Sequence, residues 1–407
     1  MSATRRRRRI RLTHTLAVCA FLLLAAVACS HASPLSPDPG KPLSADLEVR
    51  WTPVPVPAED RWHIVYELHV RNLSEPGLAL SSAEVIVQDS DSPPLYSWSA
   101  DTSTEATRHI EVLAGGGAET LVLYIWLALD RNEVPRALSH RVTLISADGR
   151  RAMVEGAPVA VDPALPLVLG PPLRGANWVA TNGPGNDSGH RRAIYDSGDG
   201  GLVPQRFATD WVRADPGRPV DRDSETFAGD PLVNANHFAY LQEVVAVADG
   251  TVTTVVDGVP DNAPNNVPDR LFGDTVAGNY IVVSIDGADG AFAVYAHLSP
   301  RSMRVGEGDV VRQGEVIALV GNSGFSSKPH LHFHVTDGDA PLQAEGLPYV
   351  IDQFGRLGRL GRDGRAGFHR AFDVPTFELP LSGMVVSFEG DRSASPPGGD
   401  QLISPLR

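Results

Sequence analysis

Residues 329–335 read Pro329-His330-Leu331-His332-Phe333-His334-Val335, with a histidine at every second position. In a β-strand successive side chains point to opposite faces, so these three histidines share one face of a sheet. Leu331 and Phe333 point to the other face, where we expect the hydrophobic core. Neighbouring imidazoles on one face lie about 7 Å apart, so one can bind a metal while the next contacts a metal-bound water. The stretch predicts a strand that carries a metal site.

Two further segments offer side chains suited to such a site. In Tyr295-Ala296-His297-Leu298, strand alternation turns His297 away from its apolar neighbours. The segment Arg206-Phe207-Ala208-Thr209-Asp210 offers the carboxylate of Asp210.

The rest of the C-terminal half also predicts short strands separated by glycine-centred turns. The strand-like runs are EVVAVADGTVTTVV (243–256), NYIVVSID (279–286), AFAVYAHL (291–298) and DVVRQGEVIALVGNSG (309–324). No sustained helical period and no fixed repeat occurs, so we expect an all-β fold. A long polar insertion at 257–278 is either a wall of the binding groove or a plain surface loop.

The N-terminal half shows the same alternation of apolar and polar residues, in the runs WHIVYELHVRNL (62–73), AEVIVQD (83–89), TLVLYIWLAL (120–129) and HRVTLIS (140–146). Turns rich in Pro, Gly and Asp separate these runs, which predicts an immunoglobulin-like antiparallel β-sandwich over residues 46–162. No catalytic cluster is visible there. We expect ordinary structural roles for its histidines, which are His63, His69, His109 and His140.

The remaining boundaries are predicted from composition. A Pro/Ser-rich linker is expected at 34–45, a Pro/Gly-rich hinge at 163–175, the catalytic-type domain at 176–350 and a C-terminal extension at 351–407. The hinge implies that few core contacts join the two halves. We expect the N-terminal domain to position or mask the C-terminal one.

Residues 1–33 resemble an export signal. Six arginines precede an apolar run, Leu16 to Ala28, which is too short to span a bilayer. The residues Ala26-Val27-Ala28 before Cys29 fit either cleavage or lipidation of Cys29, so a secreted and a lipid-anchored protein of the cell envelope both remain open. Cleavage would leave no disulfide pair, and we expect a monomer.

The chain is acidic. Its formal net charge is −14, and loss of the six arginines of the signal would make it −20. Phosphate binding needs a basic face, so nucleic acid is not expected as a partner. With 42% hydrophobic and 21% charged residues, the chain is typical of a globular protein long enough for two cores.

The motif segments, in their order, resemble the lysostaphin-type (LytM-like) peptidoglycan endopeptidases over about residues 186–345. The resemblance implies a zinc hydrolase that cleaves a peptide bond of peptidoglycan. In that family a His-x-x-x-Asp motif and the second histidine of His-x-His bind zinc, and Asp210 and His332 match these positions. The first histidine of His-x-His and that of the Tyr-x-His segment are catalytic, which implies His330 and His297. Of these, His330 would accept the proton of water and His297 would donate to the oxyanion.

One position departs from the family pattern, because Arg206 stands where the first zinc histidine is expected. A guanidinium has no free lone pair and cannot bind zinc. We expect His190 to replace it as a ligand, with His237 as the other candidate. His334 stands where the family commonly has Glu, and it is expected beside the ligands rather than among them.

The same departure leaves two functions open. In an active enzyme with a substitute ligand, Arg206 would pair with Asp210 or hold a substrate carboxylate. In a degenerate module that only binds peptidoglycan or regulates another wall hydrolase, Arg206 would occupy the place of the metal and neutralise Asp210. The survival of four family residues together favours the enzyme.

Overall fold

The computed structural model describes residues 42–388 apart from 75–77, 101–109, 116–117, 196–200, 218, 221–224, 269–272, 361–368 and 374–376. The predicted signal over 1–33 with Cys29, most of the predicted 34–45 linker and His109 lie outside these residues. The described chain is almost entirely β, which confirms the predicted fold class. Only three short 3-10 helices interrupt it, at Arg131–Glu133, Asn234–Asn236 and Gly273–Ala277. In the described part, no helix reaches the length and hydrophobicity needed to cross a membrane.

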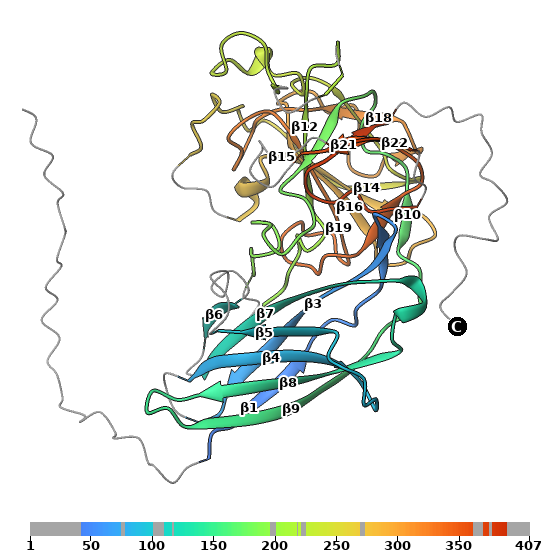
Figure 1. The fold of residues 1–407 in the computed structure, drawn as a ribbon. Coiled ribbons are helices and arrows are strands. Elements are labelled where there is room, and N and C mark those ends of the chain that lie inside the picture. Colours follow the sequence, from blue (N-terminus) through green and yellow to red (C-terminus); the bar gives the residue numbers. More distant parts are fainter. Residues whose placement is uncertain are drawn as a thin grey trace, which may run out of the picture. The chain divides into compact units, whose positions relative to one another are not determined.

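Two antiparallel sheets make up the N-terminal region (Figure 1). The five-stranded sheet contains β1 (Ala45–Val49), β2 (Val56–Ala58), β3 (Arg61–Asn72), β6 (Ile110–Gly115) and β7 (Ala118–Leu129). The four-stranded sheet contains β4 (Ala79–Val87), β5 (Tyr96–Ser99), β8 (Ala137–Ile145) and β9 (Arg151–Ala160). Their facing side chains share one hydrophobic core. The immunoglobulin-like type of this sandwich stays a prediction.

A ten-stranded antiparallel sheet forms the C-terminal region, in the order β17-β14-β15-β16-β19-β12-β11-β23-β21-β22 (Figure 1). Its strands are β11 (Trp178–Thr181), β12 (Thr209–Arg213), β14 (Gly250–Val256), β15 (Asn279–Ile285), β16 (Phe292–Leu298), β17 (Val310–Val311), β19 (Leu331–Thr336), β21 (Gly355–Arg359), β22 (His369–Asp373) and β23 (Met384–Ser387). Two pairs complete the region: β10 (Leu167–Leu169) with β20 (Tyr349–Ile351), and β13 (Glu243–Val245) with β18 (Val316–Leu319).

The predicted alternation of the histidine strand is present in β19. Leu331 and Phe333 are buried in the main C-terminal core, with exposed fractions of 0% and 1%. The register pairs Asp210 of β12 with His332 of β19, and Ala296 of β16 with His332 on the other side. Three adjacent strands therefore bring the predicted site residues to one region of the sheet.

The β3 strand is buried on both faces, although only one face was expected to be. Ile64 and Tyr66 pack into the core of the sandwich, as alternation predicts. Val65, on the opposite face, packs with Val56 and Ala58 into the core of the C-terminal sheet. The expectation that few core contacts cross the 163–175 hinge is therefore wrong, because one strand supplies both cores.

The hinge and the extension also join the C-terminal fold. Within the hinge, β10 pairs in parallel with β20. Within the extension, β23 pairs with β11 and β21 in the large sheet. The boundaries at 163–175 and 351–407 stay predictions, and in the structure each segment supplies a strand that pairs with strands of the C-terminal region.

Candidate metal centre

The centre is built on the cross-strand pair Asp210 and His332. Directly opposed residues of antiparallel strands have neighbouring Cβ atoms, so the strand register alone brings these two side chains into contact. Nδ1 of His332 lies 2.9 Å from Oδ1 of Asp210. Both side chains are nearly buried, with exposed fractions of 7% and 16%.

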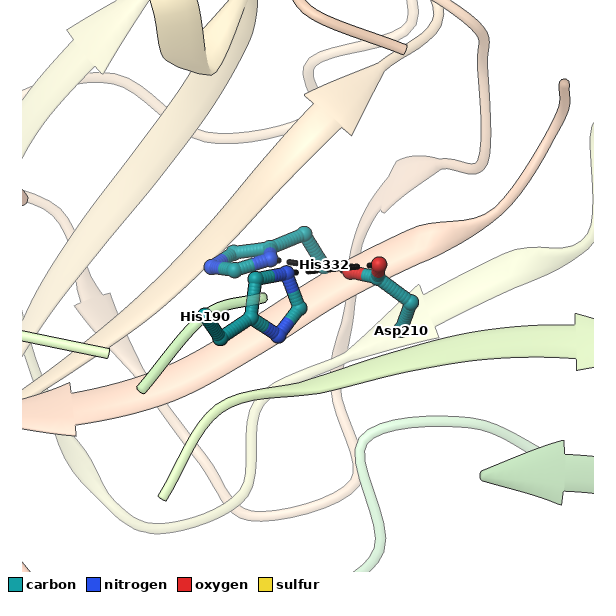
Figure 2. Close-up of side chains that lie close together, drawn as sticks. All are labelled: His190, Asp210 and His332. Carbon is teal, nitrogen blue, oxygen red and sulfur yellow. Dashed lines mark hydrogen bonds and ion pairs between the residues drawn. The ribbon is translucent and has the colours of Figure 1, made fainter. Parts of the chain in front are cut away.

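A loop after β11 brings His190, the replacement ligand proposed from the sequence, onto this pair. Nε2 of His190 lies 3.3 Å from Oδ2 of Asp210, and its ring stands edge-to-face on His332 at a centroid distance of 4.6 Å. Figure 2 shows the two imidazoles and the carboxylate converging. One ligand atom from each of the three residues lies within 4.8 Å of the others, a geometry able to hold a metal ion.

His237, the other candidate ligand, is directed elsewhere. Its Nε2 lies 2.9 Å from the backbone oxygen of Pro231, and its ring contacts Phe227. Among the described residues it is not part of the three-residue cluster. The structure thus brings only His190 of the two to Asp210.

A single backbone carbonyl sets the tautomers along the histidine row. The oxygen of Pro341 can only accept, so Nε2 of His334, 3.0 Å away, carries a proton and donates it. Burial lowers the pKa of His334 to about 4, so its Nδ1 is an unprotonated acceptor at neutral pH. Nε2 of His332, 2.9 Å away, donates to that acceptor. Nδ1 of a neutral His332 is then left with a free lone pair, directed at Asp210.

This lone pair and the Asp210 carboxylate face each other at hydrogen-bond distance. Two acceptors in such contact repel unless a proton or a cation lies between them. Burial lowers the pKa of His332 to about 3, with the nearby His190 acting in the same direction. A protonated ring is therefore not favoured at neutral pH, and the donor set fits a metal cation.

Two further histidines stand beside this cluster. The ring of His330 lies 4.8 Å from that of His297, and Nε2 of His330 lies 3.3 Å from Oδ1 of Asp210. Nδ1 of His330 donates to the backbone oxygen of Lys328 over 2.7 Å, and Nδ1 of His297 donates to that of Ser323 over 2.8 Å. Each ring, when neutral, therefore presents an unprotonated Nε2.

The position of Arg206 corrects both sequence-based roles for it. Its side chain is 2% exposed and does not pair with Asp210. Instead, Nε donates to Glu67 over 2.9 Å, and Nη2 donates to Glu345 over 3.0 Å. Nη1 donates to the backbone oxygen of Gly346. Arg206 thus neither occupies the metal position nor offers a free guanidinium to a substrate, because the carboxylates of the buried Glu67 and the partly buried Glu345 hold it.

The cluster opens into a cavity of about 640 Å³. Val267 and Pro268 line it, so the insertion at 257–278 contributes a wall, which was one of the two roles predicted for it. Phe325 lies at the same cavity and is 62% exposed, which leaves an aromatic face available for contact.

Sequence patterns did not reveal the residues that hold the His190 loop. Asn182 accepts a hydrogen bond from the backbone of Gly189 and donates to Asp210 over 3.3 Å. Arg191, next to His190, is fully buried and bonds to Glu67 of β3. For Asn182 the residue type was a signal, because asparagine accepts a positive φ at turns more readily than most residues. In the structure its φ is 46°. Nothing in the sequence points from Arg191 to Glu67.

Comparison with known proteins adds a family. Residues 237–344 match the family model described as Peptidase family M23. His297, His330 and His332 lie inside this match, whereas His190 and Asp210 precede it. No curated protein matches the chain.

Solved structures of peptidases are also similar. The catalytic domain of the prophage-encoded M23 protein EnpA from Enterococcus faecalis is 18% identical, over 30% of this chain and 85% of that one, with a TM-score of 0.20. The catalytic domain of lysostaphin from Staphylococcus simulans is 23% identical over the same shares, with a TM-score of 0.19. A zinc-containing peptidase from Vibrio cholerae is 16% identical over 75% of this chain and 86% of that one, with a TM-score of 0.19.

Proposed function

Residues 237–344 match the model of peptidase family M23, and from this premise we propose that the protein is a zinc metalloendopeptidase acting on peptidoglycan peptides. The observation that carries the proposal is the convergence of His190, Asp210 and His332 on one point. Among the described residues, the contact recorded for the lone pair of His332 at that point is the Asp210 carboxylate, which cannot donate to it. We place the protein in the cell envelope, secreted or lipid-anchored through Cys29.

His190, Asp210 and His332 are the proposed zinc ligands. Two imidazole nitrogens and one carboxylate oxygen are ligands that zinc prefers, and three protein ligands leave a fourth position open, as catalytic sites do. Zinc held by these residues would supply a lowered pKa for a water in the open position and polarisation of the scissile carbonyl. His334 keeps the proton of His332 on Nε2, so that Nδ1 stays available as a ligand atom.

His330 is the proposed proton acceptor. Its Nδ1–H is held by the Lys328 carbonyl, so the neutral ring presents its lone pair through Nε2, beside the ligand cluster. A histidine in this state can take the proton of an attacking water and return it to the leaving amine. Removing the imidazole should therefore stop cleavage without removing the metal.

His297 is the proposed second catalytic group, with one condition on its charge. Nδ1–H of His297 donates a hydrogen bond to the Ser323 carbonyl. Nε2 can therefore donate to an oxyanion only when the ring is an imidazolium. Burial, together with His330 and His332, lowers the pKa of His297 well below its usual value, which favours the neutral form. The neutral His297 ring is therefore an acceptor through Nε2. For His330, burial alone would lower the pKa, but the Asp210 carboxylate outweighs burial and raises it, so His330 is the proton acceptor only when a cation neutralises Asp210.

Zinc content and cleavage by purified protein test the proposal. We expect close to one zinc per chain and release of soluble peptides from peptidoglycan, identified by mass spectrometry. His332→Ala should lose both zinc and cleavage, whereas His330→Ala should keep zinc and lose cleavage. Zinc-loaded protein that sediments with peptidoglycan but releases nothing would establish the binding module instead. Protein that stays metal-free with zinc supplied would refute the enzyme.

A further inference from the structure

The loop that carries His190 is closed mainly by one residue. Asn182 accepts a hydrogen bond from the backbone nitrogen of Gly189 over 2.9 Å, and its backbone oxygen accepts one from Ser188 over 3.0 Å. These contacts shape residues 182–189. They do not hold the His190 ring itself, because its Nδ1 is buried and has no hydrogen-bond partner among the described residues.

This free nitrogen is unusual for a metal-binding histidine. Such a ring usually donates its second N–H to a carboxylate, carbonyl or water, which fixes its orientation. For His332, the acceptor of this second N–H is Nδ1 of His334. For His190, the placement of the ring must come from the backbone that carries it.

The next residue, Arg191, supplies this placement. Its guanidinium is fully buried and donates to the backbone oxygens of Tyr66 and Ile125 over 2.8 and 2.9 Å. It also donates to Oε1 of Glu67 over 3.1 Å and to the side chain of Asn186. Apart from Asn186, these acceptors belong to β3 and β7 of the N-terminal sandwich. Consecutive Cα atoms are fixed about 3.8 Å apart, so a fixed Arg191 restricts His190.

Glu67 is the charged group through which the N-terminal sandwich holds Arg191. Its side chain is 2% exposed, and its two oxygens are divided between Arg191 and Arg206. Burial alone would raise the pKa of Glu67, but Arg206 and Arg191 outweigh burial and hold the pKa below its usual value. Glu67 is therefore a carboxylate that neutralises two buried cations, one beside His190 and one four residues before Asp210.

We propose that Glu67 of the N-terminal sandwich is a positioning residue of the metal centre, which places the ligand His190 by holding Arg191. The inference rests on the proposed ligation of zinc by His190. It makes the sandwich part of the centre, since a ligand on the C-terminal chain takes its position from an N-terminal strand.

A cycle of variants in the full chain tests this proposal, with the zinc dissociation constant measured by chelator competition. Glu67→Gln keeps the size of the side chain and removes its charge. We expect it to weaken zinc binding about 10- to 100-fold, the range typical of groups that orient ligands. In a His190→Ala background, Glu67→Gln should cause no further loss, because the ligand through which it acts is gone. The visible spectrum of the cobalt-substituted Glu67→Gln protein should resemble that of His190→Ala.

Two variants keep the test decisive if Glu67→Gln does not fold. Asn186→Ala removes one acceptor of Arg191 and leaves Glu67 and Arg206 in place; it should weaken zinc several-fold, again only when His190 is present. Glu378→Gln is the matched control, since Glu378 accepts from the backbone of Glu59 and from Arg356 at another contact of the sandwich. It should leave the zinc affinity unchanged.

The outcomes separate this inference from the proposed function. Equal losses from Glu67→Gln with and without His190 would show a general effect on folding and overturn the positioning role. An unchanged affinity in His190→Ala would remove His190 from the ligand set, and with it both the proposed centre and the inference. A loss in His190→Ala with no effect of Glu67→Gln or Asn186→Ala would overturn the inference alone.

Discussion

The chemistry of single residues in this centre depends on which imidazole nitrogen carries a proton. Three histidine rings each donate one N–H to a backbone oxygen, of Pro341, Lys328 or Ser323. A carbonyl oxygen can only accept, so the bonded ring nitrogen must carry the proton. Each ring is thereby assigned a tautomer without any charged partner. Such assignments are as important to a metal centre as the ligands themselves.

His334 allows this dependence to be measured. His334→Phe should remove the acceptor for Nε2–H of His332 and weaken zinc about 10- to 100-fold, because the ligand tautomer is no longer enforced. His334→Glu supplies a carboxylate acceptor and should retain most of the affinity. Chelator competition measures both. Equal affinities of the Phe variant and the unaltered protein would contradict the tautomer argument.

Arg206 gives a second prediction at this scale. Restoring the family histidine with Arg206→His should create no new metal ligand, because this position faces Glu67 and Glu345 rather than Asp210. It should instead destabilise the protein by about 3–5 kcal/mol, the usual cost of breaking a buried ion pair from one side. Urea unfolding with zinc titration measures both effects. Tighter zinc binding in the variant would show that the side chain reaches the metal.

Among the elements, the neighbouring strands β16, β19 and β12 supply most of the centre, and turns supply the remainder. The turn at 321–326 holds His297 through the Ser323 carbonyl, and the Ser323 hydroxyl donates to the backbone of Leu298. Gly324 sits in this turn with a φ of +72°, and a Cβ there would collide with the backbone of Gly278. Two backbones approach so closely that only glycine fits.

Gly324→Ala should therefore displace the Ser323 turn, reduce cleavage and destabilise the fold by about 1–3 kcal/mol. Gly287→Ala is the matched control, because Gly287 has a similar φ of +75° but no atom within 4 Å of the added Cβ. It carries the backbone strain without the collision. Thermal unfolding and peptide release compare the two variants. If both lose stability and activity equally, backbone conformation alone explains the glycine at 324.

For the whole molecule, the contact between the two regions determines how independent they are. The β3 strand gives alternate residues to two cores, and Glu67 on its second face holds two arginines of the C-terminal region. A cut between the regions would expose Val56, Ala58 and Val65 and remove the carboxylate partner of Arg191, whereas Arg206 would keep Glu345. Buried charges without partners are costly.

Deletion of residues 34–165 tests this dependence. A hinge with few shared contacts would leave a folded C-terminal domain, but the shared core predicts an aggregating or molten product. Solubility and near-ultraviolet circular dichroism of the shortened chain measure the outcome. A soluble fragment that keeps a cooperative unfolding transition and binds zinc would contradict both the shared core and the role of Glu67.

The sequence by itself determined the features that local backbone geometry dictates. The period of two in residues 329–335 predicted a strand with Leu331 and Phe333 in the core, and the absence of helical periodicity predicted an all-β fold. These features need no knowledge of distant partners, because the alternation of side chains is a property of the extended chain. The family resemblance rested on the same segments.

Only the tertiary structure decided which distant segments meet. It brought His190 rather than His237 to Asp210, and it placed Glu67 against Arg206, 139 positions later in the chain. It also gave β3 a second buried face. A buried cation must find a carboxylate or carbonyl somewhere, but the sequence does not say which one, since that choice depends on how two sheets pack. The proposed third ligand and the residues that hold it are therefore consequences of packing.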